Sequence, residues 1–155
     1  MVTSDARLRE THRLLQLGIL LFLLALLVGL AVPRFAVPRL ALSVHLLGLM
    51  QGLFLSVLGL LWPRLKFPPK LSGIAFWLAV YGCFAAWTAN LLGAIWGAGN
   101  TIVPIAAGQA RGSDLQEAII VIGLRTAGLA LIVTAILVLW GLRASGNTDG
   151  DANGT

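Results

Sequence analysis

The chain has 155 residues, of which 58% are hydrophobic and 11% are charged, and its mean hydropathy is +0.91. This composition excludes an ordinary soluble domain and is typical of an integral membrane protein. The net charge of +5 comes mainly from arginines and lysines at the ends of apolar runs, which indicates contact with lipid headgroups and argues against nucleic-acid binding. The single cysteine, Cys83, excludes an internal disulfide and a multi-cysteine metal site.

Four apolar runs are each long enough to cross a bilayer as a helix, and they cover residues 14–32, 39–62, 71–97 and 114–143. The polar residues 1–13 precede them, and a Gly- and Ala-rich loop over residues 98–113 is the longest connection. Residues 144–155 are rich in Gly, Asn, Asp and Thr, so we expect a disordered tail there. The sequence therefore predicts an all-α fold, a four-transmembrane-helix bundle over residues 14–143.

The basic residues set the expected orientation in the membrane. Seven of them flank the spans on the side of the N-terminus, namely Arg7, Arg9, Arg13, Arg64, Lys66, Lys70 and Arg143. Three lie on the other side, namely Arg34, Arg39 and Arg111. The positive-inside rule therefore places both termini, including residues 1–13, in the cytoplasm. We expect a multi-pass protein of the bacterial inner membrane.

The second predicted helix contains a histidine, His45, within an apolar run. A polar side chain in hydrocarbon is costly, so the default interpretation is a functional site with a partner. Gly48 and Gly52 follow on the same side of the helix and leave a strip without side chains. A flat, bulky ligand could lie on that strip with its metal on His45. The alternative is a close helix–helix contact through Gly48, Gly52 and Ser56, with His45 hydrogen-bonded to a neighbour.

Three further side chains within the predicted helices are as costly in hydrocarbon as His45, namely Gln51, Asn90 and Arg125. Counted from the outer helix ends at about 1.5 Å per residue, His45 and Asn90 lie roughly 8 to 10 Å deep. On the same scale Gln51 and Arg125 lie roughly 16 Å deep, near the midplane. The four side chains come from three helices and all fall in the outer half of the bilayer. This agreement in depth favours a shared buried site.

Arg125 needs a counter-charge in hydrocarbon, and the chain has no carboxylate at that depth. Glu117, the nearest acidic residue in the sequence, is rotated off the Arg125 face. We therefore expect an anion from outside the chain, such as a haem propionate or an anionic substrate. The alternatives are that Arg125 snorkels or binds backbone carbonyls, and that Gln51 and Asn90 only join helices by hydrogen bonds.

Two short motifs lie within the four-helix layout, His45-x5-Gln51-Gly52 on the second predicted helix and Trp87-Thr88-Ala89-Asn90 on the third. These motifs and the layout resemble the hydroxylaminobenzene mutases, which are similar to the membrane-bound styrene oxide isomerases. The resemblance implies a homotrimeric membrane enzyme that holds haem b at its subunit interfaces. It implies that His45 is the axial ligand of the iron and that Gln51 stands where the isomerases carry asparagine. The isomerases also place a tyrosine shortly after the second motif, and residues 91–96 contain none.

The resulting hypothesis is a redox-neutral isomerase, a mutase that converts arylhydroxylamines such as hydroxylaminobenzene to 2-aminophenols. Ferric haem on His45 would act as a Lewis acid toward the N–O bond, above Gly48 and Gly52. Gln51 and Asn90 would act in catalysis by orienting the polar group of the substrate. Arg125 would pair with a haem propionate. The apolar surroundings would admit a small aromatic substrate from the lipid bilayer and limit attack by water.

The second histidine, His12, lies on the opposite side of the membrane from His45. One subunit therefore supplies one axial histidine and leaves the other axial position open to substrate. Three alternatives remain. An epoxide isomerase is disfavoured by the missing tyrosine. A small membrane transporter is the second alternative, and the absence of Asp and Glu from the middle of the apolar runs argues against a proton-coupled cation exporter. A non-catalytic haem subunit would show two axial protein ligands.

Overall fold

The computed structural model describes the backbone of residues 2–151 and the side chains of residues 5–143, and this part of the chain is all helical. Four long helices dominate it: α1 (Val2–Ala31), α2 (Pro38–Leu61), α3 (Pro69–Trp96) and α5 (Asp114–Asp151). Three short elements connect them: the 3-10 turns η1 (Val32–Arg34) and η2 (Trp62–Arg64), and the single turn α4 (Pro104–Ala107). The apolar parts of the four long helices are each long enough to cross a membrane. The predicted four-helix membrane fold is therefore confirmed.

Proline and glycine set several helix boundaries. Pro38 and Pro69 open α2 and α3, where the missing N–H of proline leaves no helical hydrogen bond unmade. At the end of α3, Gly97 adopts a left-handed conformation with φ of 66°. The N–H of Ala98 then donates to the carbonyl of Gly93 at 2.9 Å, which satisfies a terminal helix carbonyl.

Two helices are longer than their apolar runs. The α1 helix begins at Val2, within the polar segment 1–13, and α5 continues as a helix through residues 144–151. The sequence predicts a disordered tail over residues 144–155, so the backbone differs from that expectation as far as Asp151, and residues 152–155 lie outside the described residues. Hydropathy marks where a helix meets lipid, whereas intrahelical hydrogen bonds can carry the helix on into water.

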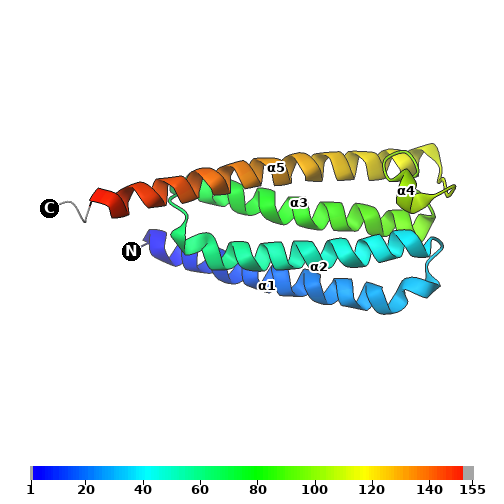
Figure 1. Cartoon of the computed structure of the whole chain (residues 1–155), viewed down its shortest axis with the longest axis horizontal. Helices are drawn as coiled ribbons and strands as arrows, with labels where there is room; N and C mark the ends of the chain where they lie inside the picture. The colour runs from blue at the N-terminus through cyan, green and yellow to red at the C-terminus, as the bar shows by residue number, and fades with distance from the viewer. Residues whose placement is uncertain (1, 152–155) are drawn as a thin grey trace.

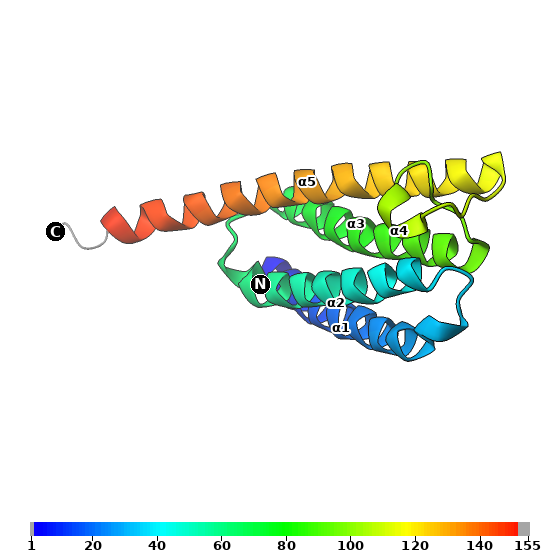
Figure 2. The same cartoon turned by 45° about the vertical axis from the view of Figure 1, so that its right-hand side comes forward.

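The long helices pack in chain order, as Figures 1 and 2 show: α1 on α2, α2 on α3, and α3 on α5. The outermost helix α5 packs chiefly on α3, and α1 touches α3 only lightly. The start of α1 and the end of α5 lie at the same end of the molecule. The arrangement leaves wide apolar surfaces of α1 and α5 exposed, as expected for contact with lipid or with other chains.

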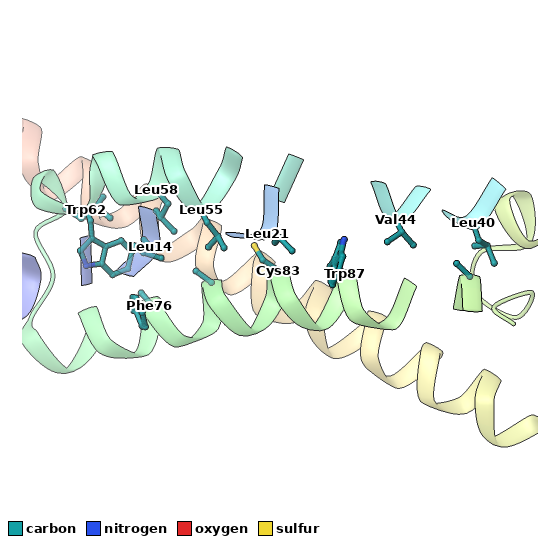
Figure 3. Packing of buried hydrophobic residues seen from close by; sticks show 14 of the residues in the cluster. Leu14, Leu21, Leu40, Val44, Leu55, Leu58, Trp62, Phe76, Cys83 and Trp87 are labelled. Carbon is teal, nitrogen blue, oxygen red and sulfur yellow. The ribbon is translucent and has the colours of Figure 1, made fainter. Parts of the chain in front are cut away.

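A continuous apolar core runs along the α1–α2–α3 side of the molecule. Among its buried residues, Figure 3 labels Leu14, Leu21, Leu40, Val44, Leu55, Leu58, Trp62, Phe76, Cys83 and Trp87. Where α1 crosses α2, glycine replaces large side chains. A Cβ at Gly52 would lie 2.7 Å from the carbonyl oxygen of Gly18 and 2.8 Å from the backbone nitrogen of Phe22. The two backbones are therefore in direct contact.

The connection between α2 and α3 is fastened to both outer helices. Arg7 of α1 donates to the backbone carbonyls of Leu65 and Phe67. The ring of Phe67 stacks on Trp140 of α5, with centroids 6.4 Å apart. The loop between α2 and α3 thus links α1 to α5 at this end of the molecule.

Candidate functional site

The imidazole of His45 turns from α2 toward α1. Its Nδ1 lies 2.8 Å from the backbone carbonyl oxygen of Ala25. A carbonyl oxygen only accepts hydrogen bonds, so Nδ1 carries a proton, and in the neutral imidazole Nε2 then keeps its lone pair. Histidines that ligate metals are commonly held in this way, with one ring nitrogen bonded to a carbonyl and the other available to the metal. The ring is only half-buried within one chain.

The glycine strip beside His45 is covered rather than bare. A Cβ at Gly48 would lie 2.6 Å from Nε1 of Trp87 and 2.7 Å from Cβ of Ala25. Gly52 meets the backbone of α1 in the same way. This packing corrects the prediction that Gly48 and Gly52 offer a surface to a flat ligand, and it matches the alternative of a close helix–helix contact. Both arrangements require missing side chains, so the pattern could not separate them.

The two predicted amides are buried in the core. Gln51 and Asn90 are 7% and 8% exposed. Asn90 donates from Nδ2 to the carbonyl of Ala86 in its own helix, at 3.0 Å. Gln51 has a buried Oε1 with no hydrogen-bond partner, and Nε1 of Trp87 is also buried without one. Figure 3 shows Trp87 pointing from α3 toward α2.

Unpaired buried polar atoms are uncommon in folded proteins and call for an explanation. Here the unpaired acceptor of Gln51 and the unpaired donor of Trp87 come from neighbouring helices within the core. The interior therefore has both a hydrogen-bond acceptor and a hydrogen-bond donor without partners. The sequence predicted a catalytic role for Gln51 and placed Trp87 in the second motif, but it assigned no role to the indole N–H of Trp87. The unpartnered indole N–H makes Trp87 a site candidate as well.

Arg125 lies apart from His45 within one chain. Its side chain is exposed on α5, and no described residue forms a hydrogen bond or ion pair with it. The helix α5 packs on α3, whereas His45 faces α1, so a single chain does not bring the guanidinium to the imidazole. The expected counter-charge from outside the chain stays a prediction.

Glu117 fastens the connection between α3 and α5. Its carboxylate accepts backbone N–H groups from Gly99 at 2.8 Å, Thr101 at 3.0 Å and Gly112 at 3.2 Å. The loop over residues 98–113, whose role the sequence left open, is thus held against the start of α5. Because the three donors are backbone groups, no residue type in the loop signals the contact.

Sequence reasoning also missed the contribution of α1 to the site. Gly18, Ala25 and Gly29 are spaced by seven and four residues, which places them on one face of a helix. That face meets α2: Gly18 at Gly52, and Ala25 and Gly29 at His45. The spacing of small residues on a leucine-rich helix was therefore a usable signal for the site.

Four long apolar helices define a polytopic membrane protein, and His45, Gln51 and Asn90 place polar side chains among these helices. Residues 10–143 match the family described as styrene oxide isomerase. The chain belongs to this family and is an isomerase. The assignment as an isomerase therefore replaces the alternative of a small transporter. No solved structure matches the chain.

Two relatives from Ectopseudomonas oleovorans extend the comparison. Hydroxylaminobenzene mutase HabB is 48% identical over 155 residues, which span 98% of this chain and 93% of the relative. Hydroxylaminobenzene mutase HabA is 40% identical over 125 residues, which span 81% of this chain and 93% of the relative. The similarity to the mutases that the two motifs predict is therefore confirmed over most of the chain.

Proposed function

We propose that the protein is a haem-dependent mutase that converts arylhydroxylamines to 2-aminophenols. The reaction is an isomerisation: the N–O bond of the hydroxylamine breaks, a C–O bond forms at the ortho carbon, and the proton lost from that carbon balances the one gained at nitrogen. No oxidant or reductant is consumed. The names of the two mutase relatives and their identity to this chain support the substrate class.

The seating of His45 is the observation that carries the proposal. A haem iron bound by one protein imidazole needs an unprotonated ring nitrogen, and the bond from Nδ1 to the Ala25 carbonyl leaves Nε2 in that state. The residues therefore fit a haem bound through Nε2 of His45. They do not fit a haem resting on Gly48 and Gly52, because α1 and Trp87 cover that strip. When bound, ferric haem would supply Lewis acidity toward the N–O bond.

The other residues hold and orient the substrate. The Oε1 atom of Gln51 accepts the N–H or O–H of the hydroxylamine, which gives this buried acceptor a partner. Asn90 uses one amide hydrogen on Ala86 and retains further donor and acceptor capacity for the polar group. The apolar side chains around them exclude water, which limits side reactions of a reactive intermediate.

The proposed assembly is a homotrimer in the bacterial inner membrane with both termini in the cytoplasm. The exposed apolar faces of the helix layer and the half-buried His45 support further copies around the site. In such an assembly the exposed Arg125 pairs with a haem propionate. The positive residues at the terminal end support the orientation.

An absorption spectrum of the purified full-length protein tests the cofactor. We expect a Soret band at one haem per chain. His45→Ala should lose the band and the mutase activity together, whereas His12→Ala, an exposed residue near the N-terminus, should retain both. A colourless active protein, or a fully active His45→Ala variant that retains haem, would overturn the proposal.

The competing activity is isomerisation of an epoxide, for which the family is named. Residues 91–96 contain no tyrosine, which disfavours it. Assaying hydroxylaminobenzene and styrene oxide with the same preparation separates the two, and we expect conversion of the hydroxylamine to be the faster reaction.

A further inference from the structure

The imidazole of His45 rests on a glycine of α1. A Cβ at Gly29 would lie 2.5 Å from Nδ1, 2.7 Å from Cε1 and 3.2 Å from Cγ of His45. The first two distances are too short for any carbon contact, so the ring edge occupies the space that a side chain at position 29 would take. Only glycine is compatible with this position of the ring.

Gly29 also controls access to the hydrogen-bond acceptor. In an α-helix the carbonyl of residue 25 accepts the N–H of residue 29, and a carbonyl has a second lone pair free. The Cβ of a helical residue tilts toward the N-terminus, so a side chain at position 29 leans over the carbonyl of Ala25. With glycine at 29 the second lone pair is open, and Nδ1 reaches it at 2.8 Å.

The acceptor is fixed relative to α2 by a second close contact. Ala25 is fully buried, and its Cβ lies 2.7 Å from where a Cβ at Gly48 would be. Gly48 is one helical turn from His45, so α1 packs tightly on α2 one turn away from the imidazole. This close packing sets the position of the Ala25 carbonyl.

We propose that Gly29 is a positioning residue: it opens the Ala25 carbonyl to Nδ1 of His45, which fixes the ring with its proton on Nδ1 and directs Nε2 away from α1. The part that concerns iron rests on the proposed function, whereas the tautomer and the ring orientation do not. Gly29 does not touch the substrate and acts only through the histidine.

The first test compares Gly29→Ala with Gly73→Ala, because a Cβ at Gly73 would have no atom within 4 Å. We expect Gly29→Ala to lower haem affinity by about 10–100-fold, as for other residues that orient a metal-binding histidine. In the ferrous protein the iron–histidine stretching frequency should fall because the Nδ1 hydrogen bond is weakened. Gly73→Ala should match the wild type in both readouts. An unchanged frequency and affinity in Gly29→Ala would contradict the proposal.

A second test keeps Gly29 and does not depend on the folding of that variant. In His45→Ala supplied with haem, free imidazole can donate to Ala25 while it binds iron, but 1-methylimidazole cannot. We expect imidazole to bind about fivefold more tightly, the value of one neutral hydrogen bond. Equal binding of the two ligands would overturn the role of the carbonyl.

If the purified protein carries no haem, the proposed function fails while the positioning role is still measurable. The chain has two histidines, so His12→Gln leaves His45 as the sole imidazole. Its 15N spectrum in the neutral state should show a protonated Nδ1 and an unprotonated Nε2, and Gly29→Ala should mix the two tautomers. A proton on Nε2 in the Gly29 protein would refute the inference.

Discussion

The α1–α2 and α3–α5 hairpins differ in the surroundings of their costliest polar side chains, His45 and Arg125. In the α1–α2 hairpin, His45 lies against α1 and bonds to a backbone carbonyl. In the α3–α5 hairpin, Arg125 points out of the chain and has no partner among the described residues. The first hairpin thus completes the immediate surroundings of its polar group, whereas the second presents a cation to whatever lies beside it.

The packing of the two hairpins follows the same division. Between α1 and α2 the contacts at Gly18 and Gly52 are backbone on backbone. Between α3 and α5 the corresponding close contact is at Gly82, where a Cβ would lie 2.7 Å from Cγ of Leu131 and 3.2 Å from the carbonyl oxygen of Ala127. A side chain can move aside more easily than a backbone, so we expect the α1–α2 contact to tolerate an added methyl group less well.

The largest expected effect is the difference between a glycine substitution in each hairpin. Gly52→Ala should lower the free energy of unfolding by about 2–3 kcal/mol, because the new methyl meets two backbone atoms of α1. Gly82→Ala should cost less than about 1 kcal/mol, since Leu131 can change rotamer. Thermal unfolding in one detergent, followed by circular dichroism, measures both. Equal losses would show that the hairpins are equally rigid.

A second comparison concerns the connection at the far end of the α3–α5 hairpin. Glu117→Gln removes an acceptor for at least one of the three backbone N–H groups, at a cost of about 1–3 kcal/mol. The loosened loop should then be cut faster by trypsin at the exposed Arg111.

Glu10→Gln is the matched control for the opposite end. Glu10 accepts from Nε1 of Trp62 at 2.9 Å and from Oγ of Ser72 at 2.6 Å, so this substitution weakens a contact far from Arg111. Its cleavage rate at Arg111 should equal that of the wild type. Equal acceleration in both variants would point to global unfolding instead of local release.

The smallest expected effect on folding is that of Arg125→Gln. Because Arg125 has no partner among the described residues of its own chain, the stability of the haem-free chain should change by less than about 0.5 kcal/mol. Haem retention should fall by about tenfold if the guanidinium pairs with a propionate, which corresponds to about 1.4 kcal/mol. Arg143→Gln, at the end of the same span, should leave retention unchanged. A large loss of stability without loss of haem would place the partner of Arg125 within the protein.

The sequence predicted the fold well because its signals are local. The apolar runs identified all four spans, and Pro38, Pro69 and Gly97 marked boundaries within a few residues. The extents of α1 and α5 were underestimated, because helix formation continues where hydropathy ends.

The candidate site was harder to predict because its contacts are made by backbone atoms. Ala25 contributes its backbone carbonyl, and Gly29 contributes by having no side chain. Neither residue type indicates a functional site in a sequence. Likewise, the depths of His45 and Arg125 follow from helix length. The neighbours of each helix do not follow from its length. The observed packing order places His45 against α1 and Arg125 on α5, and so separates the two residues.

The acceptor that holds the imidazole belongs to the main chain at position 25, so no exchange of amino acid there can delete it. The vulnerability lies four residues later, where one hydrogen atom of Gly29 stands in place of a side chain. In a saturation library, we therefore expect serine at position 25 to retain function far better than any replacement at position 29. Selection should then retain Gly29, although this residue itself performs no chemistry.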